Sequence, residues 1–249
     1  MKITVFGATG LIGSKVVAAL NEAGHDVVAA ARDTGADVLT GEGLADALTG
    51  AEVLVDVVNS PSFADDDVMN FFTTSTRNLT EAATKTGTGH YVALSIVGCD
   101  ALPDSGYMRA KVAQEKAIAA SGIDHTIVRA TQFHEFAESI TQTLVAGDEV
   151  RVPDGRIQLI ASDEVAAEVA RAAQAAAVNG IVNIGGPEKL SFADMARAVL
   201  AKHGDGDDKP VVVDAQATYF GTAVDDDSLV TGDDGKLATI RFADWLAGR

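Results

Sequence analysis

Cysteine is nearly absent from this chain: Cys99 is the single cysteine among 249 residues. One thiol excludes a disulfide framework and a cysteine-based zinc site within the chain. Four of the five histidines are scattered without the spacing of metal ligands, so we expect no metal site; they are His25, His90, His125 and His203. A reducing cytosol is the simplest compartment for such a chain, and we predict a cytoplasmic protein.

Basic residues are also scarce, with 19 Lys and Arg against 36 Asp and Glu and a formal net charge of −17. Because like charges repel, this balance disfavours binding to a nucleic-acid backbone or to an anionic membrane surface. No apolar run approaches the length of a membrane span, and no basic-then-apolar leader precedes the first strand. The predicted partner is therefore a small-molecule substrate, and the oligomeric state is left open.

Internal repeats and a hydrolase motif are lacking too. Residues 95–98 read Ser-Ile-Val-Gly, without the Gly-x-Ser-x-Gly elbow that carries a hydrolase nucleophile. Hydrophobic residues make up 47% of the chain, which is enough to bury one full core. We therefore expect a single domain over residues 1–249.

Strand-like runs alternate with helical ones along most of the chain. Continuous Val, Ile and Ala in the strand-like runs indicate strands buried on both faces of a parallel sheet. The predicted strands cover residues 2–6, 26–31, 37–39, 53–58, 91–94, 125–128 and 181–184, and the predicted helices cover residues 11–23, 65–86, 107–120, 162–176 and 191–203. The fold class is α/β, a doubly wound parallel sheet. Two acidic, Gly-rich segments, 204–209 and 225–235, are expected to be exposed loops.

Three glycines follow the first predicted strand and precede the first predicted helix. A backbone approaches a phosphate closely only where side chains are missing, and the first turn of a helix presents unpaired N–H groups. This order predicts a site for a dinucleotide pyrophosphate, formed by Gly7, Thr9, Gly10, Leu11, Ile12 and Gly13. The sheet is then a Rossmann fold, with a dinucleotide-binding core over residues 1–131 and core plus substrate-covering segments over 132–249.

The end of the second predicted strand indicates which dinucleotide binds. An acid at this place selects free ribose hydroxyls, whereas an arginine accepts a 2′-phosphate. Arg32 comes first after the apolar residues 27–31, and Asp33 follows it. We expect Arg32 to hold the phosphate and Asp33 to begin a turn, so the predicted cofactor is NADP (NADPH), with NAD less favoured.

A second cluster carries the predicted chemistry. Ser95 ends a predicted strand, and Tyr107 and Lys111 lie four residues apart on the helix that follows. Residues at this spacing share one helix face, so both can face the end of the strand. A nearby ammonium lowers the pKa of a phenol and lets it exchange a proton with a substrate oxygen, which Ser95 can hold by a hydrogen bond.

Taken together, these residues resemble the short-chain dehydrogenase/reductase superfamily. The chain is more closely similar to the atypical NmrA-like and quinone-reductase-like branch, through residues 94–98 (LSIVG) and 129–136 (RATQFHEF). The resemblance covers most of the chain, strongly to about residue 136. It implies that Tyr107 is the acid–base, that Lys111 binds the nicotinamide ribose and tunes Tyr107, and that Ser95 orients the substrate carbonyl.

The resemblance and the topology also imply further cofactor contacts. Val57, Val58 and Asn59 would lie over the cofactor, and the segment from Ala130 to Phe133 would border the nicotinamide. His134 and Glu135, just beyond, have a substrate contact and a structural role as alternatives.

Three functions remain open at this point. The leading one is an NADPH-dependent reductase of a small carbonyl or quinone. The second is a dinucleotide sensor without turnover, since NmrA-like relatives include such regulators, although these typically lack the tyrosine. The third is an epimerase or dehydratase acting on a nucleotide sugar, which we rank last because the part after Thr131 is short for a nucleotide-sugar lobe.

Overall fold

The computed structural model describes residues 1–203 and 209–248, which fall into two compact units. The first unit holds residues 1–95, 106–129 and 165–182, and the second holds the remaining described residues. The chain passes between the units several times. One crossing, after Arg129, lies close to the expected end of the core at residue 131. That the whole chain forms a single domain stays a prediction.

A seven-stranded sheet, in the order β13-β10-β5-β4-β3-β1-β2, is the framework of the fold. Its strands are β1 (Lys2–Phe6), β2 (Asp26–Ala30), β3 (Val53–Asp56), β4 (His90–Ile96), β5 (Asp124–Ala130), β10 (Gly180–Gly185) and β13 (Lys236–Leu237). Strand β1 pairs in parallel with β2 and β3, and β3 pairs in parallel with β4. The short β13 is added in parallel to the last two residues of β10. The predicted α/β fold with a parallel sheet is confirmed.

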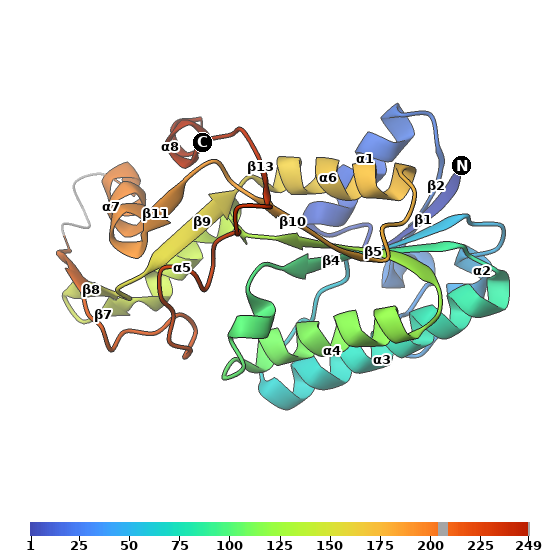
Figure 1. Cartoon of the computed structure of the whole chain (residues 1–249), viewed down its shortest axis with the longest axis horizontal. Coiled ribbons are helices and arrows are strands. Elements are labelled where there is room, and N and C mark those ends of the chain that lie inside the picture. Colours follow the sequence, from blue (N-terminus) through green and yellow to red (C-terminus); the bar gives the residue numbers. More distant parts are fainter. Residues whose placement is uncertain (204–208, 249) are drawn as a thin grey trace. The chain divides into compact units, whose positions relative to one another are not determined.

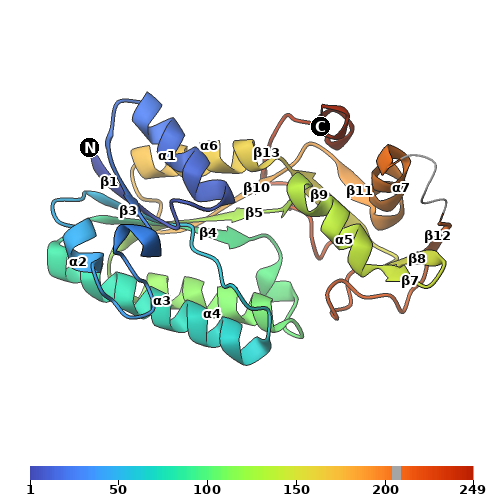
Figure 2. The same cartoon turned by 180° about the vertical axis from the view of Figure 1, so that it is seen from behind.

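Helices cover both faces of the sheet in the first unit (Figure 1). On one face lie α1 (Leu11–Glu22) and α6 (Ser162–Gln174), and on the other lie α2 (Leu44–Ala47), α3 (Asp65–Thr86) and α4 (Gly106–Ala120). Figure 2 shows the same layers from behind. The sheet is therefore doubly wound, as predicted.

Helix α3 covers the residues that the sequence predicts. Its first turn holds Asp65, Asp66 and Asp67, where the helix dipole favours negative charge, and Gly87 ends it in the left-handed conformation with φ 75°. Arg109 of α4 donates a hydrogen bond to Asp65 at 2.7 Å. The acidic run thus begins the helix predicted over residues 65–86, and Asp65 pairs with the neighbouring α4.

The strand order reverses at β1. The chain runs from β1 to β2 on one side and then crosses to β3 on the other side of β1. In open α/β sheets, ligands bind beyond the carboxyl ends of the strands at such a switch point. The segments after β1 and β3 are therefore the place where this topology positions a ligand.

The strand predicted over residues 37–39 is wrong. The Asp37 carboxylate accepts the N–H groups of Leu39 at 2.8 Å and Thr40 at 3.3 Å, and the Asp37 carbonyl accepts the N–H of Gly41 at 2.9 Å. An aspartate that binds the backbone of the following residues closes a turn and competes with strand pairing. The local hydrogen bonds therefore outweigh the apolar side chains of this short run, and β2 is the edge of the sheet.

The second unit contains two small sheets. One has the order β11-β9-β6, and the other has the order β12-β8-β7. Their strands are β6 (Gln132–Phe133), β7 (Val145–Ala146), β8 (Glu149–Val152), β9 (Arg156–Ile160), β11 (Lys189–Ser191) and β12 (Val211–Val213); the helices of this unit are α5 (Ala137–Thr143), α7 (Phe192–His203) and α8 (Phe242–Ala247). The sequence patterns predict α7 and miss the small sheets, because strands of two to five residues carry little periodicity.

The later predicted elements are mostly present. The helix predicted over residues 162–176 is α6, and the strand predicted over 181–184 is β10. The helix predicted over 191–203 is α7, and Ser191 caps it, since its Oγ accepts the N–H of Asp194 at 3.0 Å. Residues 225–235 form a loop, as predicted, but the expected exposure is wrong for its middle, where Leu229, Val230 and Thr231 are buried. The other predicted loop, 204–209, lies outside the described residues except for Lys209.

Candidate functional site

The loop after β1 turns sharply at Gly7, which has φ 82°. A Cβ atom at this position would lie 2.8 Å from the backbone oxygen of Val57, the first residue after β3. A side chain is thus excluded both by the backbone conformation and by the close approach of a second segment. The two segments at the switch point are therefore in contact, and a glycine makes that contact possible.

Gly13 and Gly10 allow the same loop to close on itself. A Cβ atom on Gly13 would lie 2.0 Å from the carbonyl oxygen of Gly7, and one on Gly10 would lie 3.3 Å from it. Gly10 is the N-cap residue of α1, and its side-chain position is empty, so the first turn of the helix is bare. Thr9, Gly10 and Leu11 are exposed, while Ile12 is buried beneath them. A bare helix N-terminus of this kind can bind a phosphate, and that it does so here stays a prediction.

Arg32 lies where the sequence predicts, just beyond β2 at the start of a short 3₁₀ turn, η1 (Arg32–Thr34). Its side chain is 75% exposed, and its Nε lies 3.2 Å from an oxygen of Asp37. Gly35 ends the turn in the left-handed conformation. An exposed guanidinium at the end of the strand beside β1 can bind an anionic group, and its Nε is paired with the Asp37 carboxylate.

Tyr107 is held at the start of α4 by a hydrogen bond and by two rings. Its hydroxyl donates to Oδ1 of Asn59 at 2.5 Å. The ring of Phe72 meets its ring edge-on at 5.7 Å between centroids, and the exposed Phe63 lies 5.8 Å away at 31°. Tyr107 is half-buried, so its hydroxyl is fixed beside the segment that contacts Gly7.

The expected lowering of the Tyr107 pKa is wrong for this structure. Burial raises the pKa of Tyr107 to about 12, because a phenolate loses hydration in this environment. The phenol is therefore protonated at neutral pH. It is suited to give a proton, and much less suited to take one.

Lys111 is buried on the same face of α4, at 4% exposure. Its ammonium donates to the carbonyl oxygen of Leu94 at 2.9 Å and to Oε1 of Gln114, and it lies 4.3 Å from the centre of the Phe72 ring. The lysine thus reaches the end of β4, as predicted. Its charge, however, is shared with a buried polar network that the sequence analysis did not identify.

Asp56, the last residue of β3, is the acidic member of that network. Its carboxylate accepts hydrogen bonds from Tyr91 at 2.8 Å, from Gln114 at 2.9 Å and from the N–H of Val58 at 3.1 Å. Burial raises the pKa of Asp56, while the charge of Lys111 and these hydrogen bonds oppose the rise. Gln114 therefore links the lysine to a carboxylate. The polar residue three positions after Lys111 on one helix face was the available signal.

Ser95 belongs to a different buried group. Its hydroxyl donates to Oε1 of Glu115 at 2.5 Å, and the Glu115 carboxylate receives two hydrogen bonds from Arg129, at 2.8 and 2.6 Å. Ser95 is 3% exposed, Glu115 7% and Arg129 9%. Ser95, Tyr107 and Lys111 are hydrogen-bonded to different partners in this structure, although the Lys111 ammonium reaches the carbonyl of Leu94, the residue before Ser95. That the three act together on one substrate oxygen stays a prediction. The Ser95 hydroxyl thus already donates its hydrogen to a buried carboxylate.

The remaining predicted site residues lie in the second unit, and each is described there. Ala130 is buried at the end of β5, and Phe133 in β6 is half-buried and stacked on Phe136 at 5.3 Å. His134 is 1% exposed and packs against the rings of Phe242 and Trp245.

Glu135 binds the first residue of α6. Its carboxylate accepts hydrogen bonds from the N–H and the hydroxyl of Ser162. The structural alternative therefore accounts for the contacts of both His134 and Glu135.

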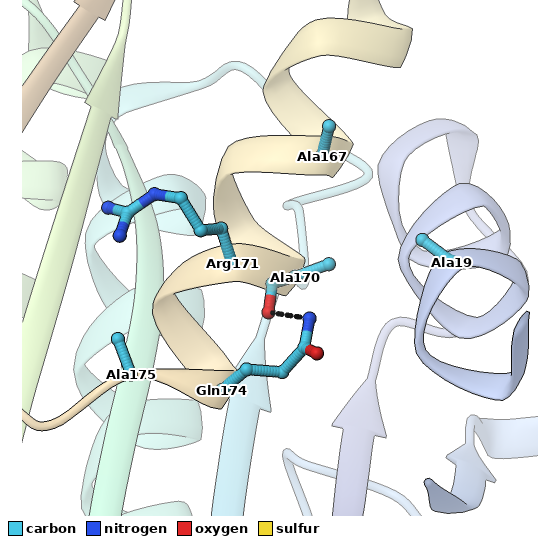
Figure 3. Close-up of a pocket in the computed structure, with 6 residues that line it drawn as sticks. All are labelled: Ala19, Ala167, Ala170, Arg171, Gln174 and Ala175. Carbon is cyan, nitrogen blue, oxygen red and sulfur yellow. Dashed lines mark hydrogen bonds between the residues drawn. The ribbon is translucent and has the colours of Figure 1, made fainter. Parts of the chain in front are cut away.

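Two other features of the described residues bear on the site. They contain no group of three His, Cys, Asp or Glu side chains that could hold a metal ion, and no helix among them is long and apolar enough to cross a membrane. Figure 3 shows a hollow between α1 and α6, lined by Ala19, Ala167, Ala170, Arg171, Gln174 and Ala175. None of these residues belongs to the glycine loop or to the Tyr107 cluster.

The parallel sheet, its switch point and the glycine turn define a class: an α/β dinucleotide-binding protein. The model of the NAD(P)H-binding family matches residues 7–176, so the chain belongs to this family. The match begins at the first glycine of the loop and extends through α6. No curated protein matches the chain.

Solved structures with similar folds span nearly the whole chain. WbmH from Bordetella bronchiseptica, in complex with NAD+, is 15% identical, with a TM-score of 0.73 over 99% of this chain and 96% of that one. UDP-glucose 4-epimerase from Thermus thermophilus, in complex with NAD, is 19% identical over 88% of each chain, with a TM-score of 0.69. A GDP-6-OMe-4-keto-L-xylo-heptose reductase from C. jejuni is 14% identical, with a TM-score of 0.72 over 98% and 95%. At these identities the likeness shows the fold alone.

Proposed function

We propose that the protein is an NADPH-dependent reductase of a small carbonyl or quinone, of the short-chain dehydrogenase/reductase type. One observation carries the proposal: the half-buried Tyr107 hydroxyl lies 2.5 Å from Asn59, in the segment whose first residue contacts the glycine loop. A proton donor and a phosphate cradle are thus brought together at one switch point. This combination is what reduction of a carbonyl requires.

The residues present fit a dinucleotide. The bare first turn of α1 would hold the pyrophosphate, and the segment Val57 to Asn59 would lie along the cofactor. The bound cofactor supplies the hydride. Tyr107 donates its proton to the carbonyl oxygen as that oxygen gains charge, and its raised pKa keeps the proton in place until then. A quinone needs this acid less, so Tyr107 matters most for carbonyl substrates.

Lys111 and Ser95 take different places in the proposal. We keep Lys111 as the ligand of the nicotinamide ribose, as the resemblance implies, with Gln114 and the Leu94 carbonyl holding its ammonium. Of the three predicted catalytic residues, Ser95 is the one that the geometry favours least, because its hydroxyl donates its hydrogen bond to Glu115. The proposed catalytic pair is therefore Tyr107 and Lys111.

The preference for NADP over NAD is part of the proposal and rests on Arg32. Its guanidinium is 75% exposed beyond β2, where a 2′-phosphate would lie if the pyrophosphate occupies the glycine loop. Two of the similar structures described above were solved with NAD. Arg32 is thus the residue on which this chain's cofactor choice depends.

Two alternative functions are each supported by a specific observation. A sensor that binds NADP(H) without turnover would need the same cradle, and the occupied Ser95 favours it. An enzyme acting on nucleotide sugars is favoured by the similar folds, since this chain spans 88% to 96% of the epimerase, reductase and WbmH structures described above. The small size of the later part of the chain is therefore a weaker objection than it first looks.

A titration followed by turnover assays tests the proposal. NADPH and NADH are titrated by fluorescence, and NADPH consumption is then followed with a panel of quinones, aldehydes and UDP-glucose. We expect Tyr107→Phe to lower kcat for an aldehyde about 10²- to 10⁴-fold, the usual contribution of a positioned acid. Lys111→Ala should weaken cofactor binding, whereas Lys116→Ala, which removes an exposed lysine of the same helix, should not.

Three outcomes would contradict the reductase. Tight NADPH binding with no panel member reduced favours the sensor. Conversion of UDP-glucose without net NADPH consumption favours the nucleotide-sugar enzyme. If Tyr107→Phe leaves turnover unchanged, the phenol has no catalytic role.

A further inference from the structure

The amide of Asn59 is placed to do what the sequence assigns to Ser95. Its Oδ1 accepts two hydrogen bonds, from the Tyr107 hydroxyl at 2.5 Å and from the N–H of Ser60 at 2.9 Å. Asn59 is exposed, and within residues 1–203 and 209–248 nothing accepts its two Nδ2 hydrogens. A fixed amide thus presents unused N–H donors beside the phenol.

Ser95 differs from Asn59 in each of these respects. Its hydroxyl is 3% exposed and donates to Glu115, which is itself held by two hydrogen bonds from Arg129. Releasing Ser95 toward a substrate would leave a buried carboxylate with one hydrogen bond fewer, at a cost of about 1–3 kcal/mol. Asn59 bears no such cost, since its Nδ2 group faces solvent before a substrate arrives.

The backbone also brings Asn59 close to the glycine loop. Val57 is in contact with Gly7, and Asn59 follows Val57 by two residues, a span of at most about 7 Å. Asn59 is therefore close in the chain to the residue that contacts the glycine loop, and its amide is hydrogen-bonded to the Tyr107 hydroxyl. A carbonyl that accepts the Tyr107 proton has its oxygen within reach of Nδ2.

We propose that Asn59 is a catalytic residue that binds the substrate carbonyl oxygen through Nδ2, beside the Tyr107 hydroxyl, in the place predicted for Ser95. The inference rests on the proposed reductase function. When the carbonyl binds, the phenolic O–H turns from Asn59 Oδ1 to the carbonyl oxygen. The carbonyl carbon gains the hydride supplied by the reduced cofactor and the oxygen gains the phenolic proton, which leaves an alcohol, the oxidised cofactor and a tyrosinate. Water returns a proton to the tyrosinate. The Asn59 amide loses no atom, and it stabilises the negative charge that builds on the oxygen.

Three substitutions separate the donor of Asn59 from its acceptor. Asn59→Asp keeps an oxygen that accepts from Tyr107 but has no N–H donor, Asn59→Ala removes both, and Asn59→Ser restores a hydroxyl that can donate and accept. Asn70→Ala, at an exposed position of α3, is the matched control. Each is assayed with NADPH and the aldehyde of the panel that the parent reduces fastest, and NADPH binding is measured separately by fluorescence.

We expect Asn59→Asp and Asn59→Ala to lower kcat about 10²-fold or more, the usual effect of losing one donor to a developing oxyanion. Because Asn59 also lies in the segment proposed to run along the cofactor, their NADPH Kd can rise, but kcat at saturating NADPH should fall by a larger factor. Asn59→Ser should recover part of kcat. In the cofactor-free protein, the ¹³C signal of the Tyr107 ring carbon that bears the hydroxyl should shift in Asn59→Ala and not in Asn70→Ala.

Several results would overturn the inference. Asn59→Asp with full kcat shows that the donor is not used, and a loss confined to NADPH binding makes Asn59 a cofactor contact. An unchanged ¹³C signal in Asn59→Ala would mean that Tyr107 and Asn59 are not hydrogen-bonded in solution. If Tyr107→Phe is inactive while the Asn59 variants are normal, the inference alone fails. If the parent reduces quinones and no aldehyde, the inference fails and the proposed function stands. If the parent reduces neither, the proposed function fails as well.

Discussion

The ends of β1 and β4 were both predicted to hold functional residues, but the residues at the two ends differ in their surroundings. After β1, Gly7, Gly10 and Gly13 form the bare helix start that the spacing predicts. At the end of β4, Ser95 faces Glu115 and lies in a buried ion-pair group. One prediction concerned a backbone conformation, and the other concerned where a side chain points.

The difference shows what kind of statement a sequence supports. A glycine at a turn is required by backbone geometry alone, so its reason is local. The direction of a serine at a strand end depends on which residues of the next helix and strand lie opposite it. Here Glu115, twenty residues later, supplies the acceptor, and Arg129 balances its charge.

Breaking the Glu115 group should give the largest effect on stability. Glu115→Ala leaves Arg129 buried without its carboxylate, and removing one partner of a buried ion pair costs about 3–5 kcal/mol. Glu81→Ala, at an exposed position of α3, should stay within about 0.5 kcal/mol of the parent. Urea unfolding followed by circular dichroism measures both.

The same measurement on Ser95→Ala sharpens the contrast between the two strand ends. We expect a loss of about 1–3 kcal/mol in the free energy of unfolding, because Glu115 loses a buried hydrogen bond. Equal stability for the two Glu variants would mean that the group is not structural. A Ser95→Ala protein of full stability but without turnover would restore the original catalytic role.

A pair of glycine substitutions tests the β1 end. Gly7 and Gly24 both have φ 82°, but a Cβ atom on Gly7 would lie 2.8 Å from Val57 while one on Gly24 would meet no atom within 4 Å. Both alanine variants bear the strain of a positive φ, about 1–2 kcal/mol. Gly7→Ala should lose a further 1–3 kcal/mol or so from overpacking and should weaken NADPH binding.

Urea midpoints and fluorescence titrations compare the two glycine variants directly. Equal losses of stability would mean that the contact between the loops after β1 and β3 can relax. Unchanged NADPH binding in Gly7→Ala would place the pyrophosphate elsewhere.

Arg32 should give the smallest effect, since an exposed guanidinium contributes little to folding. Hydrogen bonds to charged groups contribute about 1.5–3 kcal/mol, so we expect Arg32→Ala to weaken NADPH binding about tenfold or more. NADH binding should be nearly unchanged. Arg77→Ala, an exposed arginine of α3, is the control, and an unaltered ratio of the two Kd values would refute the NADP assignment.

The elements themselves were largely predictable. Strand β1 and helix α3 have the predicted bounds, because strong apolar periodicity and clear end signals coincide there. The failure at residues 37–39 came from Asp37, whose carboxylate closes a turn over the apolar residues that follow. The small sheets of the second unit were missed because their strands are too short to show a period.

The site residues also differ in how well the sequence predicts them. The places of Gly7 and Arg32 could be predicted from position alone. Gly7 lies in a turn that needs a residue without a side chain, and Arg32 lies just beyond a strand. The partners of Tyr107 and Lys111 could not, since Asp56 and Asn59 come from the end of β3, which is far from α4 in the sequence, and Gln114 joins Lys111 to Asp56. Polar residues at Gln114 and Glu115, one turn after Lys111, were visible, but their partners were not.

The sequence by itself determined the doubly wound sheet, the glycine turn and membership of a nucleotide-binding class, because these follow from local periodicity and from backbone conformations that few residues adopt. Only the tertiary structure decided that Ser95 is buried against Glu115 and that the Tyr107 hydroxyl is bound to Asn59. It also decided that burial raises the pKa of Tyr107 to about 12. The physical reason is that hydrogen-bond partners and desolvation arise between segments distant in sequence, which packing alone brings together.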